Sequence, residues 1–210
     1  MPYFILMIVV SYLAGSFPTA IVYGKLSRNT DIRQHGSGNA GATNVFRVLG
    51  WKAGLLVLLI DMLKGLLATI LIFKIAAGSV AINTVLLQII AGLSAVFGHI
   101  WTVFAGFKGG KGVGTGAGMI IGLVPGAVLL SVIVFIIVVA LTHYVSLGSI
   151  LASLAIPVYL FINHFVLHRP EPLAILIFGI FIPLLIIFTH RSNIGRLLKG
   201  TENKIKFRKS

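Results

Sequence analysis

Residues 36–44, GSGNAGATN, contain the first group of side chains that could bind a charged substrate. Gly36, Gly38 and Gly41 have the G-x-G-x-x-G spacing of a dinucleotide-binding loop. That interpretation requires a preceding β-strand, and here an apolar run and a polar stretch precede the loop. A carboxylate does follow about 20 residues later, at Asp61, but it lies inside the next apolar run. We therefore reject a nucleotide site.

The same segment still suits a phosphate group. A glycine-rich loop that opens a helix directs unpaired N–H groups at an anion. Ser37, Asn39, Thr43 and Asn44 add side-chain donors, and Arg47 adds a permanent positive charge. The alternative is a tight turn between helices in which Asn and Ser act as caps. Four donors and an arginine within a short segment favour anion binding.

A second segment, residues 98–115, reads GHIWTVFAGFKGGKGVGT. It is not a P-loop, because Ala105 stands where the first glycine should be and Gly112 stands where Ser or Thr should follow the lysine. Lys108 and Lys111 nevertheless lie among glycines at the start of an apolar run. The alternative is a positively charged flank of a membrane span. Two polar residues on the adjoining helices favour a site: His99 and Thr115.

The third segment is residues 190–202, HRSNIGRLLKGTE. His190, Asn193 and Arg196 follow one another at three-residue steps, and His190, Asn193 and Leu197 share one face of a helix. The alternative is an amphipathic helix that lies on lipid headgroups and ends at Gly200. Such helices carry Lys and Arg, whereas His and Asn add little to headgroup binding. This composition favours a functional segment.

The composition shows which elements must position these segments. The chain has 210 residues, of which 58% are hydrophobic and 10% charged, and its mean hydropathy is +1.06. A soluble domain would carry about a quarter charged residues, so this is a membrane protein. Seventeen Lys and Arg against four acidic residues give a net charge of +13. No soluble basic domain is present to bind nucleic acid, and the absence of Cys excludes disulfides, thiolate metal sites and a cysteine nucleophile.

Six apolar runs organise the chain, and none shows the alternation of a barrel strand. They predict an all-α integral membrane protein in one polytopic domain, residues 1–210. We expect the first run, which starts at Pro2, to be a retained span, because it is too long for a signal peptide and lacks a basic start. The runs are residues 3–23, 53–73, 81–105, 113–141, 147–163 and 173–189.

The number of spans depends on residues 113–141. As one helix this run would extend roughly 44 Å, well beyond a hydrocarbon core of ~30 Å, and Pro125 lies near its middle. Splitting it there gives seven transmembrane helices, with the N-terminus outside and the C-terminus in the cytoplasm. The positive-inside rule supports this count, because only Lys74 and Arg169 then lie outside. All three polar segments then reach the cytoplasmic face.

A few polar residues lie near the spans. Asp61 and Lys64 stand three apart on one predicted helix, where an ion pair and a functional role are equally compatible with the pattern. Ser146 falls in the cytoplasmic turn before the sixth helix and could reach the site. His164 and His168 fall on the outer side, where we expect no role.

Together, the three segments resemble motifs of the bacterial PlsY family of membrane glycerol-3-phosphate acyltransferases, and the resemblance covers essentially the whole chain. The motifs extend from Ser37 through Arg47, from Gly98 through Val113, and from His190 through Gly200 to Glu202. Two positions depart from the usual pattern. Gly114 stands where the family more often has Ala, and Thr102 where Pro is frequent.

The resemblance implies a reaction. An acyl phosphate donates its acyl group to the 1-hydroxyl of glycerol 3-phosphate, giving lysophosphatidic acid and phosphate in the first step of phospholipid synthesis. It implies a multi-pass enzyme of the bacterial inner membrane with a cytoplasmic active site. Neither metal nor cofactor is expected, and a soluble protein that makes acyl phosphate is a conceivable partner. The implied catalytic residues are Ser37, Arg47, Lys111, His190 and Asn193; the implied substrate contacts are Gly36, Gly38, Asn39, Gly41, Thr43, Asn44, His99, Lys108, Gly109, Gly110, Gly112, Thr115, Ser146, Arg191, Arg196 and Glu202.

The attacking hydroxyl must lose a proton, and two candidates for the base that accepts it remain. Glu202 lies near basic residues that would lower its basicity, and Ser37 has no adjacent base. His190 is one candidate, and the phosphate of the substrate itself is the other. We favour the substrate phosphate, with His190 and Asn193 holding it.

A transporter for an anionic phosphorylated metabolite is the competing function. Seven helices and clustered cations would suit it. Such a protein usually has repeated halves and a polar path through the midplane, and the sequence shows no repeat and only one charged pair within the spans. These observations favour the enzyme.

Overall fold

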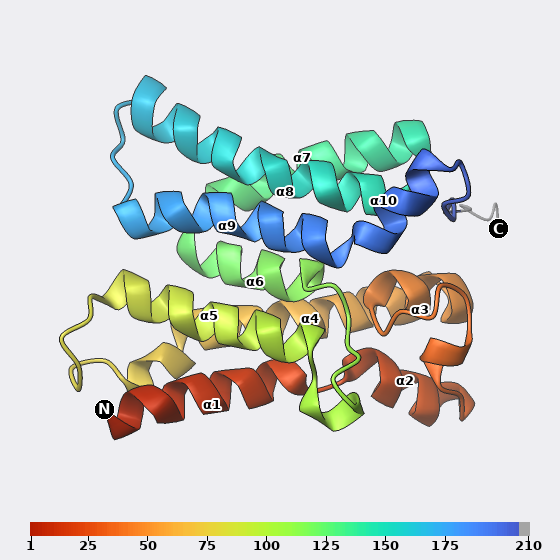
Figure 1. The fold of residues 1–210 in the computed structure, drawn as a ribbon, viewed down its shortest axis with the longest axis horizontal. Coiled ribbons are helices and arrows are strands. Elements are labelled where there is room, and N and C mark those ends of the chain that lie inside the picture. Colours follow the sequence, from red (N-terminus) through yellow and green to blue (C-terminus); the bar gives the residue numbers. More distant parts are fainter. Residues whose placement is uncertain (206–210) are drawn as a thin grey trace. The chain divides into compact units, whose positions relative to one another are not determined.

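The computed structural model describes residues 1–205, and over that range it contains helices, turns and loops but no strand (Figure 1). The last basic residues counted above, at positions 206, 208 and 209, lie outside the described residues, as does Ser210. The contacts between helices group the chain into two compact units, Met1–Leu123 and Val124–Ser210. The first unit holds the first two polar segments, and the second unit holds the third.

The first unit contains six α-helices and three short 3₁₀ helices. They are α1 (Pro2–Ser16), α2 (Thr19–Arg28), η1 (Ile32–Gln34), α3 (Ala42–Leu49), α4 (Trp51–Ile70), η2 (Ile72–Ile75), α5 (Thr84–Ile100), η3 (Val103–Ala105) and α6 (Val113–Leu123). The second unit contains α7 (Pro125–Thr142), α8 (Val145–Phe161), the π-helical turn η4 (Ile162–Val166), α9 (Leu173–Thr189) and α10 (Arg191–Leu198).

Five helical stretches within the described residues are long and apolar enough to cross a membrane, which agrees with the predicted class. They are Pro2–Arg28, Trp51–Ile75, Thr84–Ala105, Pro125–Thr142 and Val145–Val166. A sixth is obtained if α9 and α10, which are bent by 63°, count as one span. The one predicted span that remains, the fourth along the chain, corresponds to α6, which is apolar but has only 11 residues.

The predicted break at Pro125 is confirmed. Helix α6 ends at Leu123 and α7 begins at Pro125, where the missing N–H and preset φ of proline suit the first helical position. The two halves of the split run differ in length. Helix α7 continues to Thr142 and has 18 residues, whereas α6 extends only about 16 Å at 1.5 Å per residue.

A second break, at Pro18, was not predicted. The first apolar run predicts one span, but α1 ends at Ser16 and α2 begins at Thr19. Proline disfavours helical geometry in the residue before it, and Phe17 accordingly has φ −53° and ψ 115°. The break exposes the Phe17 carbonyl oxygen, which becomes a hydrogen-bond acceptor for the buried cluster described below.

Glycines set the close packing within the first unit, where α1 contacts α5 and α4 contacts α6 (Figure 1). A β-carbon on Gly15 would overlap the carbonyl oxygen of Ala95, and one on Gly65 would overlap that of Thr115. The backbones of these helix pairs therefore approach one another directly. In lipid, where no hydrophobic force drives helices together, such contacts are a main source of association.

In the second unit, α8 packs against both α7 and α9. At the end of α8, the Asn163 amide donates to a Glu171 carboxylate oxygen over 2.8 Å, and the Glu171 N–H donates to His164 Nδ1 over 3.1 Å. These bonds join η4 to the segment that leads into α9, and they give His164 a local structural contact.

Candidate functional site

The first polar segment is folded around the side chain of Asn44, which is only 1% exposed. Its amide nitrogen donates to the carbonyl oxygens of Ile32 at 2.9 Å and His35 at 3.0 Å, and its amide oxygen accepts from the Ser37 N–H at 2.8 Å. Both donors of this amide are therefore used inside the loop. Asn44 shapes the loop, and the direct substrate contact predicted for it finds no support in its geometry.

Two glycines of this loop are required by the backbone. Gly36 and Gly38 have φ values of +61° and +73°, a region that residues with a side chain rarely adopt. A β-carbon on Gly36 would also overlap the amide oxygen of Asn44. Ser37, held between them, has an exposed side chain.

The loop rests on a small core and then opens helix α3. Ala40 and Val45 are buried against Ile32 of η1, which fixes the point where the helix begins. Thr43 and Arg47 lie four residues apart on α3 and so share one face. The first-turn N–H groups of α3, Thr43 and Arg47 together form an arrangement suited to an anion.

Arg33, which lies just before the first segment, connects this part of the chain to the second segment. The Asp31 carboxylate lies 2.7 Å from the Arg33 guanidinium, and Arg33 also donates to the carbonyl oxygen of Ala105 in η3 at 3.2 Å. Hydrogen bonds from the Arg33 side chain and backbone lower the pKa of Asp31 to about 2. Arg33 is thus committed to a structural bridge to the second segment.

The second segment is anchored on the last turn of α5. The N–H groups of Gly109 and Gly110 donate to the carbonyl oxygens of Ile100 at 3.0 Å and His99 at 3.1 Å. The resemblance implies substrate contacts at both glycines. For these two glycines the structure gives another reason, because their N–H groups bind the end of α5.

The remainder of the second segment leads into α6. Gly112 has φ +82° and precedes the first turn of the helix. Lys108 is exposed and Lys111 is partly buried. Thr115, by contrast, is completely buried, and its hydroxyl has no hydrogen-bond partner among the described residues. The substrate contact predicted for Thr115 finds no support in this position.

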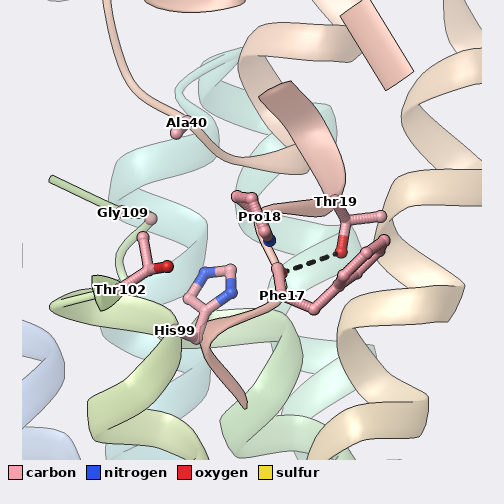
Figure 2. Close-up of a pocket in the computed structure, with 8 residues that line it drawn as sticks. Phe17, Pro18, Thr19, Ala40, His99, Thr102 and Gly109 are labelled. Atoms are coloured by element: carbon pink, nitrogen blue, oxygen red, sulfur yellow. Dashed lines mark hydrogen bonds between the residues drawn. The ribbon is translucent and has the colours of Figure 1, made fainter. Parts of the chain in front are cut away.

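A small pocket marks where the first two segments meet (Figure 2). Ala40 of the first segment and Gly109 and Gly110 of the second line it, together with His99 and the break from Phe17 to Thr19. Its volume of 10 Å³ corresponds to about one water molecule. The pocket therefore shows that the two loops are neighbours within the first unit, and it is too small to be a complete substrate site.

A buried polar cluster lies beneath this pocket. The Lys64 ammonium is 2.7 Å from the Asp61 carboxylate, and His99 Nδ1 is 3.7 Å from the same oxygen. The ion pair that the sequence left as one alternative is thus present. The Thr19 hydroxyl donates to Asp61 at 2.9 Å, and Lys64 donates to the Phe17 carbonyl oxygen at 2.9 Å.

Thr19 was missed by the sequence analysis. It stands inside an apolar run, and only the break at Pro18 turns its hydroxyl toward α4. The two departures from the family pattern are also accommodated. The Thr102 hydroxyl donates to the Ser16 carbonyl oxygen, and a β-carbon on Gly114 would lie 3.2 Å from the Asp61 β-carbon, which requires only a small shift.

In the second unit, Glu202 accepts hydrogen bonds that link the third segment to α8. Its carboxylate accepts hydrogen bonds from Asn193 at 2.6 Å, Arg196 at 2.7 Å and Ser146 at 2.9 Å. Gly200, with φ +68°, ends α10 as predicted and turns the chain back toward these partners. Ser146, Arg196 and Glu202, which the resemblance predicts as substrate contacts, are therefore joined by hydrogen bonds.

His190 lies at the start of α10 and is 3% exposed. Its Nδ1 is 2.8 Å from the Ile186 carbonyl oxygen. A carbonyl oxygen can only accept, so Nδ1 carries the hydrogen and donates it. In the neutral ring, Nε2 is then the nitrogen that can accept a proton; in the imidazolium, Nε2 also carries a hydrogen, and this is the form that would donate to a phosphate oxygen.

The Glu202 contacts predict a pH-dependent stability. Burial alone would raise the pKa of Glu202, but the hydrogen bonds from Asn193, Arg196 and Ser146 outweigh burial and lower the pKa below its ordinary value of 4.5. A lowered pKa stabilises the fold above the unfolded value, and the stabilisation is lost as pH falls through the folded value. Glu202→Gln should lower Tm in detergent by several degrees at pH 7, a cost of about 1–3 kcal/mol. The difference from wild type should shrink below pH 4.5, and an equal difference at all pH values would contradict the assignment.

Among residues 1–205, no group of three or more His, Cys, Asp or Glu could hold a metal ion. Each unit instead offers donors and cations. The first unit places Ser37, Thr43, Arg47, Lys108 and Lys111 on two adjoining loops and the helices they open. The second unit joins Ser146, Asn193, Arg196 and Glu202 and places His190 at the start of α10.

Comparison with known proteins gives a consistent result. A family model described as glycerol-3-phosphate acyltransferase matches residues 5–200. Proteins of that name from Chlorobaculum tepidum and Chlorobium phaeobacteroides are 48% and 47% identical to this chain, and each match covers 97% of both sequences. The crystal structure of PlsY (YgiH), an integral membrane glycerol 3-phosphate acyltransferase, in its glycerol 3-phosphate form is 39% identical with a TM-score of 0.83, covering 97% of this chain and 96% of that one. A second crystal structure of PlsY, in a lysophosphatidic acid form, matches at 38% identity with a TM-score of 0.81.

Proposed function

The chain belongs to the glycerol-3-phosphate acyltransferase family, and we propose that its acyl donor is an acyl phosphate. The acceptor is the 1-hydroxyl of sn-glycerol 3-phosphate, and the products are 1-acyl-glycerol 3-phosphate and phosphate. The hydroxyl oxygen attacks the acyl carbonyl carbon, the bond from that carbon to the phosphate oxygen breaks, and the hydroxyl proton passes to a base. The donor is already activated, so the protein has to bind two phosphorylated molecules and orient them.

The observation that carries this proposal is the meeting of two glycine-rich, cationic loops at Ala40 and Gly109–Gly110. Each loop opens a helix, α3 or α6, whose first-turn N–H groups favour an anion. Arg47 on α3 and Lys111 before α6 supply charges for phosphate groups, and Ser37 of the first loop supplies a donor. Two phosphorylated substrates need this kind of duplicated anion site.

The second unit adds further ligands for glycerol 3-phosphate in this proposal. His190 and Asn193 hold its phosphate, and Glu202 keeps Asn193 and Arg196 in a set orientation through the bonds described above. Ser146 shares the same carboxylate. Asn44 and His99 act through the architecture of the loops, because the Asn44 amide binds backbone groups of its own loop and the His99 carbonyl oxygen holds the Gly110 N–H. Thr115, which is completely buried, acts through the packing of α6.

The direct test is a reconstituted reaction. Purified protein with acyl phosphate and labelled glycerol 3-phosphate should form lysolipid and phosphate in equal amounts. Acyl thioesters, supplied in parallel, should give no product. Lysolipid from a thioester alone would overturn the donor while leaving the family assignment intact. Uptake of glycerol 3-phosphate into liposomes without acylation would instead support the transporter.

We also propose seven spans in the bacterial inner membrane, with the three polar segments in the cytoplasm and the break before Pro125 near the outer face. The charge distribution supports this topology. The short α6 would depend on neighbouring helices or local thinning of the bilayer.

Because the chain has no Cys, single thiols can report this topology. Ser210→Cys should resist an impermeant reagent in intact cells and react after permeabilisation, whereas Lys74→Cys, which the topology places outside, should react in intact cells. Labelling of Ser210→Cys from outside would exclude the seven-span arrangement.

A further inference from the structure

The buried cluster of Asp61, Lys64 and His99 has no direct part in the proposed chemistry. The three residues are 3%, 8% and 8% exposed and lie on α4 and α5. Burying charges in a membrane protein costs several kcal/mol unless they are paired and hydrogen-bonded. The pairing is observed, but replacing a buried ion pair by apolar residues is often neutral for stability, so a role beyond stability is worth seeking.

His99 supports the second polar segment from the side of Gly109 and Gly110. A β-carbon on Gly110 would overlap His99 Nε2, and one on Gly109 would overlap the His99 carbonyl oxygen. The His99 carbonyl oxygen also accepts from the Gly110 N–H at 3.1 Å. The loop therefore lies directly on this residue, through both its ring and its backbone.

Asp61 supports the same segment from its other end. The β-carbon that Gly114 lacks would lie 3.2 Å from the Asp61 β-carbon, so the first turn of α6 packs on this part of α4. One turn further along α4, Gly65 lies against the Thr115 backbone. Lys111 stands between the two contacts, one residue after Gly110 and three before Gly114.

Lys64 joins the two supports. Its ammonium is 2.7 Å from Asp61 and 3.5 Å from His99 Nδ1. An ammonium has only hydrogens to offer, so Nδ1 is the acceptor and Nε2 carries the ring hydrogen that faces the loop. The orientation of the His99 ring is in this way linked to the ion pair.

We propose that Asp61, Lys64 and His99 are positioning residues for Lys111, holding the loop before it and the helix after it from beneath. This inference rests on the proposed function, in which Lys111 binds a substrate phosphate. Binding of a point charge depends on where the ammonium sits, and a displacement of about 1 Å can cost up to two decades in rate. The cluster gives Lys111 two buried supports that do not depend on solvent-exposed contacts.

A double-mutant cycle tests this assignment. His99→Ala alone should lower kcat/KM about tenfold or more, whereas in the Lys111→Ala background the same change should lower it less than about threefold, because coupled residues are non-additive. The loss of thermal stability should be the same in both backgrounds. Ser94→Ala, which removes a hydroxyl bonded within its own helix α5, is the matched control and should change activity less than about twofold. Equal losses of activity from His99→Ala in both backgrounds would overturn the inference, since a purely structural role acts without regard to Lys111.

Thiol labelling tests the positioning role without relying on the acyl-transfer assay. In the Cys-free chain, Lys111→Cys provides one thiol whose labelling rate reports the loop. Adding His99→Ala or Asp61→Asn should change that rate by about threefold or more, while a control thiol from Ser27→Cys should keep its rate. Asp61→Asn also serves if His99→Ala does not fold. Unchanged labelling at Lys111→Cys defeats the positioning role even if no acyl transfer is seen, whereas a failed donor assay with changed labelling defeats only the proposed donor.

Discussion

Replacing Arg47 or Lys111 with Ala will lower kcat/KM by about one to two orders of magnitude, because each change leaves a substrate phosphate without a charged partner. Arg47 lies on α3 and Lys111 directly precedes the residue before α6; these two helices follow the loops that meet at the pocket in the first unit. Steady-state assays that vary each substrate in turn will show which phosphate each residue binds. A rise in KM for one substrate alone would assign the residue to that substrate.

Two further variants separate a specific contact from general positive charge. Arg47→Lys should remain impaired if the guanidinium binds the phosphate through two parallel hydrogen bonds, which an ammonium cannot reproduce. Lys25→Ala removes an exposed cation from α2 and should change kcat/KM less than about twofold, because screened surface charges contribute little. Wild-type kinetics from Arg47→Ala would remove Arg47 from the site.

Much of the fold could be predicted because lipid leaves a chain few choices. Continuous apolar runs must become helices, and Pro125 had to interrupt a run too long for one span. Pro18 carries the same physical information, yet its run was short enough to be one span, so nothing in the length exposed the break. The consequence was that Thr19, the hydroxyl between Asp61 and Lys64, went unnoticed.

The chemistry of the site could be predicted only in part. Residue types show which side chains can donate hydrogen bonds, but whether a donor points at a substrate or into its own loop depends on how the loop folds. Asn44 and the N–H groups of Gly109 and Gly110 looked like phosphate ligands, and the structure uses them to shape the loops. Asp61 and Lys64, which the pattern left undecided, form an ion pair, and both also bond to the break between α1 and α2.

His190→Gln will decide how the attacking hydroxyl loses its proton. In the structure, Nδ1 donates to the Ile186 carbonyl oxygen at 2.8 Å, so any role in the reaction falls to Nε2. Glutamine keeps a donor near that position but cannot serve as a base. If His190 holds the phosphate of glycerol 3-phosphate, KM for this substrate should rise about tenfold while most of kcat survives at saturation. If His190 is the base, kcat should instead fall by roughly 10²–10⁴ with little change in KM.

The pH profile provides a second and independent criterion. A phosphate monoester has a second pKa near 6, so a reaction in which the substrate phosphate accepts the proton should slow below about pH 6 in wild type and in His190→Gln alike. With His190 as the base, the acidic limb belongs to the imidazole and should disappear with it. Ser192→Ala, exposed on the same helix, should leave both kinetic constants and the profile unchanged. An acidic limb that persists in His190→Gln, together with a raised KM, would establish His190 as a ligand and the substrate as its own base; loss of that limb would make His190 the general base.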